Sequence, residues 1–421
     1  KRGDRGSGVI SLQKLLQKTG YLQSPPTGYY GLLTREAIAQ FQRDAGFNEN
    51  GIADVNTQSQ LKQYLTINKN SEISAHKGDE RAIIAAQKIE PGQFKIIKKI
   101  EGELTPKSVV YSDSGLFFVQ NMMYEHSIAV YDRQFQPVKT IKDGVNLEKF
   151  GYPEFKAEKY KGSPVEAAMS PDGKFAYISN YQMFGPEFNN PGYDTCLPSN
   201  HFDRSFLYRV DTESLTVEDA IKVGSVPKFL AVSPDGKQVV VSNWCSGDVS
   251  VIDTETHREI QRISVGRFPR GIAIAPDSTT AYIAVMGTSD IAKIDLKDYS
   301  LSWIYGVGLY PRHLVLDSAG KYLYVTLNGD DHVAKIDAET GEIIRKIFTG
   351  AAPRSMVLSD DDRFLYVVNY YSHTVSKVRA ADMEIIGTVE VDLNPIGITY
   401  DPKTRQVWVA CYTGSLVVIQ D

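Results

Sequence analysis

The sequence predicts two domains of different class, a small all-α three-helix domain followed by an all-β seven-bladed propeller. Three observations support this fold class. Residues 1–66 carry apolar side chains at helical spacing. A repeat with a period of 42 residues, rich in β-branched and aromatic residues, occupies residues 93–421. Residues 67–92 are polar and show no period, so we expect them to form a linker between the two domains.

The first domain is predicted from three short amphipathic segments. The apolar positions of the first helix are Val9, Leu12, Leu15 and Leu16. Thr34 stands where an N-cap is expected for a second helix, TREAIAQFQRDAG, and a third helix is expected from Asn56. Three such helices are enough for a small compact core.

The motifs of this domain occur in the order found in the three-helix peptidoglycan-binding domain. The resemblance to that family covers nearly all of residues 1–66. Three segments carry it: RGDRGSGVISLQKLLQKTGYL, TGYYGLLTREAIAQFQRDAGF and NGIADVNTQSQL. The loop TGYYG differs, because the family more often has an aspartate before its first glycine. The resemblance implies peptidoglycan as a partner, and aromatic and amide side chains suit a sugar-peptide polymer. The contact candidates are Tyr29, Tyr30, Gln40, Gln42 and Arg43, with a core role left open for Tyr30 and expected for Phe41.

The second domain is predicted from regularly spaced prolines. Pro227, Pro269, Pro311, Pro353 and Pro395 are 42 residues apart, and Pro106 and Pro164 begin two further units that carry insertions. Each unit reads as an apolar strand, a PDGK-type turn and further strands, which is the pattern of a four-stranded propeller blade. The seventh unit has only three strands and ends in LVVIQD. We expect residues 93–103, QFKIIKKIEGE, to supply its fourth strand and close the ring.

The repeats resemble the YVTN-type, WD40-like β-propeller repeat of many bacterial surface and periplasmic proteins. The resemblance rests on the motifs YVTLN at 324–328, YVVN at 366–369 and YISN at 177–180, together with SPDGK at 170–174 and 233–237. The resemblance implies the fold, whereas function depends on the residues of a particular site.

In propellers of this type the residue after each repeated proline lies near the mouth of the central channel. The seven positions are Lys107, Val165, Lys228, Arg270, Arg312, Arg354 and Ile396. The second strands are expected to end on the same face, where they place Asn121, Asn180, Asn243 and Asn369 beside Tyr181, Trp244, Tyr370 and Tyr412. A ring of cations can bind an anionic ligand. Alternatively, each arginine caps carbonyl groups or pairs with an acidic neighbour from the next blade, such as Glu166 or Asp248.

No catalytic motif is evident, and the sequence predicts no cofactor, no metal site and no catalytic residue. It contains no Gly-rich phosphate loop and no HExxH, CxxC or GxSxG motif. The three cysteines are too few for a disulfide framework. Cys196 and Cys245 lie in neighbouring loops of the expected mouth, where they form either a disulfide or two free thiols, and Cys411 is expected to be buried.

These features favour a non-enzymatic, cell-wall-associated binding or scaffold protein, anchored to peptidoglycan and presenting a propeller face to a ligand or a protein partner. One alternative is a propeller enzyme of lactonase or lyase type that acts at the channel mouth. Another is a DNA-binding periplasmic propeller, which the net charge of −5 disfavours. The chain begins at Lys1 rather than methionine, and we expect an exported protein of the periplasm or cell wall, with its signal peptide outside this sequence.

Overall fold

The computed structural model describes residues 7–18, 21–22, 30, 32–44, 50–54, 57, 61, 94–124, 126–196 and 201–421. Contacts divide the chain into two compact units, Lys1–Lys88 and Ile89–Asp421. Among the described residues, no helix has the length and apolar character needed to cross a membrane.

The described part of the first unit contains two helices, α1 (Ser7–Lys18) and α2 (Leu32–Asp44). Their apolar faces form one buried cluster that includes Leu16, Ile38 and Phe41, so Phe41 is a core residue as expected. Thr34 lies inside α2 rather than at its N-cap, and its hydroxyl accepts a hydrogen bond from Gln13 Nε2 at 2.8 Å. The predicted third helix lies mostly outside the described residues, as does the predicted linker at 67–92.

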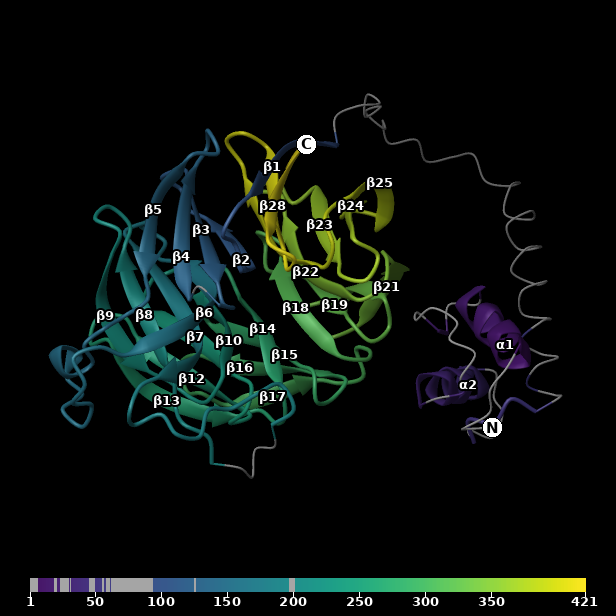
Figure 1. Ribbon diagram of the computed structural model, residues 1–421, viewed down its shortest axis with the longest axis horizontal. Coiled ribbons are helices and arrows are strands. Elements are labelled where there is room, and N and C mark those ends of the chain that lie inside the picture. The colour runs from purple at the N-terminus through teal and green to yellow at the C-terminus, as the bar shows by residue number, and fades with distance from the viewer. Residues whose placement is uncertain are drawn as a thin grey trace. The chain divides into compact units, whose positions relative to one another are not determined.

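The second unit is a seven-bladed propeller of four-stranded antiparallel sheets (Figure 1). Blade one contains β2 (Pro106–Tyr111), β3 (Leu116–Asn121), β4 (Ser127–Asp132) and β5 (Pro137–Lys142). Blade two contains β6 (Lys161–Met169), β7 (Phe175–Phe184), β8 (Phe206–Asp211) and β9 (Thr216–Lys222), and the short helix η1 (Glu148–Phe150) precedes it. Blade three contains β10 (Pro227–Val232), β11 (Gln238–Asn243), β12 (Asp248–Asp253) and β13 (Arg258–Ser264).

The remaining blades repeat this order. Blade four contains β14 (Pro269–Ile274), β15 (Thr280–Val285), β16 (Asp290–Asp295) and β17 (Leu301–Ile304). Blade five contains β18 (Pro311–Leu316), β19 (Tyr322–Leu327), β20 (His332–Asp337) and β21 (Ile343–Phe348). Blade six contains β22 (Pro353–Leu358), β23 (Phe364–Asn369), β24 (Thr374–Arg379) and β25 (Glu384–Glu390). Blade seven contains β26 (Pro395–Asp401), β27 (Gln406–Cys411), β28 (Ser415–Gln420) and β1 (Lys95–Glu101).

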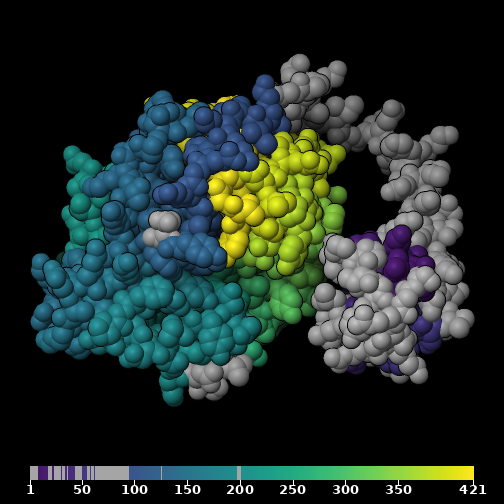
Figure 2. Space-filling view, in the orientation of Figure 1, coloured from purple at the N-terminus to yellow at the C-terminus, as the bar shows by residue number. Residues whose placement is uncertain are grey.

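The ring closes inside blade seven, as the sequence predicts. β1 pairs antiparallel with β28, and Ile100 lies opposite Leu416. The space-filling view shows the early residues of the propeller in blue against its last residues in yellow (Figure 2). Closure satisfies a strand edge that the last three strands would otherwise expose. The first strands of the seven blades then neighbour one another in a closed circle around the channel.

Each inner strand begins at the same end of its blade, and this end forms the channel mouth. In blade three, Pro227 at the start of β10 lies opposite Asn243 at the end of β11. Pro353 and Asn369 have the same register in blade six. The mouth therefore gathers the starts of the first strands and the ends of the second strands, as the sequence predicts.

Candidate functional site

A β-bulge follows the repeated proline in every blade. In blade three the register passes from Pro227 opposite Asn243 directly to Phe229 opposite Ser242, so Lys228 has no partner in the ladder. The same register shift follows the other six prolines. A bulge removes a residue from regular pairing and redirects its side chain. Where a basic residue follows the repeated proline, the bulge therefore leaves its side chain outside the regular strand pairing at the channel mouth.

The residue before the proline adopts a left-handed backbone in the five blades with the 42-residue period. These residues are Val226, Phe268, Tyr310, Ala352 and Asn394, with φ between 51° and 62°. Non-glycine residues in this region cost about 1 kcal/mol or more each. Such strain persists only where the surrounding structure enforces it, and it concentrates at functional sites. The turn and the bulge together form the repeated local geometry of the mouth.

The five basic side chains of the ring lie close enough to affect one another electrostatically. Burial, followed by the charges of Arg270 and Arg312, lowers the pKa of Lys107. Burial, followed by the charges of Arg270 and Arg354, lowers the pKa of Arg312. Burial also lowers the pKa of Arg270 to about 10, so this guanidinium remains charged at neutral pH. The predicted ring of cations is therefore brought together in the structure.

Two carboxylates partly offset these charges. Asp194, from the second insertion, pairs with Lys228 and accepts a hydrogen bond from Tyr181 Oη at 3.1 Å. Desolvation acts to raise the pKa of Asp194, but the charge and hydrogen bond of Lys228 lower it to about 2. Burial raises the pKa of Glu166 to about 7, against hydrogen bonding by Ser108 and the charge of Arg270. Sequence reasoning missed Asp194, although its position in an insertion two residues before Cys196 was a signal.

Aromatic rings flank the cations. The Arg354 guanidinium lies 3.5 Å from the centroid of the Tyr370 ring, and Lys228 Nζ lies 3.8 Å from that of Trp244. Lys107 Nζ lies 5.3 Å from the Tyr412 ring centroid. Cations at these distances are attracted to the negative face of an aromatic ring. The aromatic residues predicted at the mouth thus hold the cations in place.

A cavity of about 370 Å³ opens beside the ring. Lys107 and Lys228 line it together with Asp194 and His126. Its aromatic and thioether lining consists of Met122, Met123, Tyr124, Tyr181, Phe184 and Tyr412. The cavity has the size of a small-molecule site and the mixed lining that such sites have.

The four asparagines predicted on this face are buried. Asn121, Asn180, Asn243 and Asn369 are at most 1% exposed. Asn369 Nδ2 donates to Thr349 O at 2.9 Å and to Ser376 Oγ at 3.0 Å. A Cβ on Gly350 would lie 2.7 Å from Asn369 Cγ, which explains the glycine that precedes this proline. The amide nitrogens of all four residues donate hydrogen bonds within the propeller, and a ligand contact through these residues stays a prediction.

A disulfide fixes the second insertion at the mouth. Cys196 is bonded to Cys245 in the turn after β11, with the two Cα atoms 5.5 Å apart. Trp244 Nε1 donates a hydrogen bond to Asp194 O at 3.0 Å. The indole of Trp244 also stacks on Phe268, with ring centroids 4.5 Å apart. Cys411 is free and buried.

Of the two acidic residues proposed from the sequence as partners of the ring cations, one interacts with the ring and the other does not. Asp248 lies 3.8 Å from Arg262 and accepts a hydrogen bond from Asn243, so it is not a partner of the ring. Glu166 does act on Arg270, whose pKa it raises against the effect of burial. Within the described part of the chain, Lys228 alone among the five ring cations forms an ion pair.

Two of the peptidoglycan-contact candidates are buried. Tyr30 is 2% exposed and its hydroxyl donates to Gly51 O at 3.0 Å. Gln42 is 1% exposed, and its side chain accepts from Gly51 N at 2.8 Å and donates to Thr57 Oγ1 at 3.1 Å. The polar atoms of both side chains are therefore engaged by Gly51 or Thr57, and their contact with peptidoglycan stays a prediction. Gln40 is half-buried on α2, whereas Tyr29 and the side chain of Arg43 lie outside the described residues.

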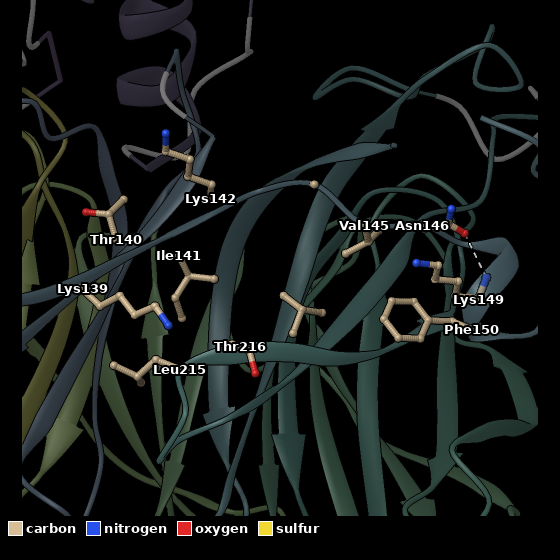
Figure 3. A pocket seen from close by; sticks show the side chains of 12 residues that line it. Lys139, Thr140, Ile141, Lys142, Val145, Asn146, Lys149, Phe150, Leu215 and Thr216 are labelled. Atoms are coloured by element: carbon tan, nitrogen blue, oxygen red, sulfur yellow. Dashed lines mark hydrogen bonds between the residues drawn. The ribbon is translucent and has the colours of Figure 1, made fainter. Parts of the chain in front are cut away.

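A second cavity, of about 430 Å³, lies on the outer edge of blades one and two (Figure 3). Ile141, Val145, Phe150 and Leu215 supply apolar lining, with Lys142 among the basic residues around it. Lys139 is already engaged, since its Nζ donates to Ser214 O at 2.9 Å. The channel mouth is the stronger candidate site, because its cations are buried, converge and belong to a repeated geometry.

Binding of an anion at the mouth is expected to strengthen as the pH falls from about 8 to about 6. Burial, followed by the charge of Arg270, lowers the pKa of Lys228 to about 7, so this lysine gains a proton in that interval. Glu166 also has a pKa of about 7 and loses its negative charge there. Both changes make the mouth more positive. Sulfate is a suitable probe because it stays doubly charged, and calorimetric titration at fixed ionic strength should show an increase of about fivefold or more.

The triple variant Lys228→Gln, Glu166→Gln and His126→Gln is the control for this pH dependence, because the imidazole of His126 lines the same cavity and can also gain a proton in this interval. It lacks all three of these groups and should bind sulfate with an affinity that changes little over the same interval. A wild-type affinity that is independent of pH would contradict the prediction.

Comparison with known proteins agrees with this architecture. The family model for a peptidoglycan binding domain matches residues 5–61, and the model for a YNCE-like beta-propeller matches residues 193–280. Among solved structures, a chain of the Kuenenia stuttgartiensis hydrazine synthase has a TM-score of 0.60 and 19% sequence identity, covering 76% of this chain and 97% of that chain. A likeness at this identity shows the fold alone. The N-terminus thus matches a model of a peptidoglycan-binding domain, and the seven-bladed β-propeller that follows contains a segment that matches a YNCE-like propeller model.

Proposed function

We propose that this protein is a non-enzymatic binding protein of the bacterial cell envelope, in the periplasm or at the cell wall. In this proposal the N-terminal domain holds the protein on peptidoglycan. The propeller binds an anionic ligand, or an anionic group of a protein partner, at the channel mouth. The two domains then have separate tasks, one of anchoring and one of recognition.

The incompletely neutralised ring of cations is the observation that carries the propeller's part of the proposal. Five basic side chains converge on the mouth, against the two carboxylates Asp194 and Glu166. Arg270 and Arg312 are 7% and 8% exposed. Buried charges are costly unless they are paired. A bound anion would supply the missing partner, and the bulges and aromatic contacts hold the cations in place before it arrives.

The match over residues 5–61 supports the anchoring part. The described residues there form a buried core around Leu16 and Phe41, as a stable domain requires. Because Tyr30 and Gln42 are buried, Tyr29, Gln40 and Arg43 are the stronger candidates for polymer contact.

Purified peptidoglycan sacculi should sediment the full chain and leave residues 94–421 in solution. The comparison is fair because residues 94–421 include both β1 and β28 and so retain the closed ring. Circular dichroism and a thermal melt would establish that the shorter chain is folded. Sedimentation of the propeller alone, or failure of the full chain to sediment, would overturn the assignment of the anchor.

A further inference from the structure

We infer that the mouth takes an amphipathic anion, with a planar apolar body and at least two negative charges. This inference rests on the proposed function and narrows the class of its ligand. Two features of the same channel mouth carry it. Among the described residues, the buried Nε atoms of two ring arginines have no hydrogen-bond partner, and a cavity with aromatic and thioether lining is bounded by two other cations of the ring, Lys107 and Lys228.

The guanidinium groups define the charged end of the ligand. Within the described residues, the buried Nε atoms of Arg312 and Arg354 have no hydrogen-bond partner. Arg312 is 8% exposed, and its Nη1 approaches only the sulfur of Met286, at 3.9 Å. Guanidinium N–H groups bind carboxylate, phosphate and sulfonate oxygens with matched geometry. Two neighbouring guanidiniums that need acceptors favour a ligand with more than one negative charge.

The cavity defines the apolar end. Tyr181, Phe184 and Tyr412 contribute aromatic surface, and Met122 and Met123 contribute thioethers. Aromatic faces and polarisable sulfur both favour contact with a planar ring. At about 370 Å³, the cavity can hold a ring system.

Lys107 connects the two ends and sets the orientation of the ligand. It lines the cavity, and it also lies near enough to Arg270 and Arg312 for their charges to lower its pKa. Lys228, on the same cavity, is already paired with Asp194. The charges that remain available are therefore on the arginine side. A ligand would place its anionic groups there and its ring in the cavity.

Calorimetric titration of the full chain with three probes tests this inference. Naphthalene disulfonate has a planar body and two charges, sulfate has two charges without a body, and naphthyl methanol has the body without a charge. We expect the disulfonate to bind about tenfold more tightly than sulfate, and naphthyl methanol to give no measurable binding. Arg312→Gln should weaken disulfonate binding about tenfold, with Arg354→Gln as a second test should the first variant not fold. Arg363→Gln removes the same charge from the opposite end of blade six and should have no effect.

Each alternative outcome has a definite meaning. Equal affinity for sulfate and the disulfonate would overturn the amphipathic class and leave anion binding at the mouth intact. Equal weakening by Arg312→Gln and Arg363→Gln would show binding outside the mouth and overturn the inference. Failure of both anions to bind at low ionic strength would overturn the inference and the propeller's part of the proposed function. The sacculus experiment tests the anchor independently.

Discussion

Replacing Cys196 and Cys245 together by serine is expected to lower the free energy of unfolding of the propeller by about 4 kcal/mol. The disulfide joins residues 49 positions apart and so restricts a long loop in the unfolded chain. It also holds the segment that carries Asp194 against Trp244. Denaturant titration of the oxidised wild type and the double variant measures the loss.

Reduction of the wild type is the matched control for this variant. Dithiothreitol should lower wild-type stability by a similar amount and leave the double variant unchanged. Wild-type stability that does not respond to reductant would contradict the prediction.

The same variant should alter the binding site, because Asp194 would no longer be held beside Lys228. Asp194→Asn separates the two effects, since it removes the charge and retains the disulfide. Both variants should bind sulfate more tightly than the wild type, but only the double cysteine variant should be destabilised by several kcal/mol. Tighter binding in neither variant would mean that Asp194 does not compete with an anion.

Trp408→Ala is expected to lower the free energy of unfolding by about 4 kcal/mol. Trp408 on β27 is fully buried and stacks on Phe117 of β3, with ring centroids 3.8 Å apart. This contact joins the last blade to the first, so the cavity left by alanine would lie at the closure of the ring. Trp303→Ala, on the outer strand β17, is the matched control and should cost about 1 kcal/mol. Equal losses in the two variants would show that the closure is no more sensitive than an outer strand.

The repeat made the blades predictable from sequence. Prolines spaced 42 residues apart indicated the innermost strands, and the missing strand of the seventh unit pointed to residues 93–103. β1 pairs with β28 accordingly. The period also predicted that the basic side chains would meet at the channel mouth, because they occupy equivalent positions in equivalent strands. These residues are Lys107, Lys228, Arg270, Arg312 and Arg354. Such features recur because they depend on local interactions that each blade repeats.

The chemistry of the mouth depended on contacts that the sequence pattern does not display. The sequence determined which residues stand at the start of each inner strand, but the register shift that frees Lys228 from the ladder appears only in the paired strands. Asp194 reaches Lys228 from an insertion outside the repeat, across 34 positions of chain. The burial of Asn369 and of Gln42 likewise depends on which backbone groups lie within hydrogen-bonding distance. A sequence period reveals the local interactions that every blade repeats. A long-range contact made by a single insertion has no counterpart in the other blades and so produces no period. Only the tertiary structure therefore decided such contacts.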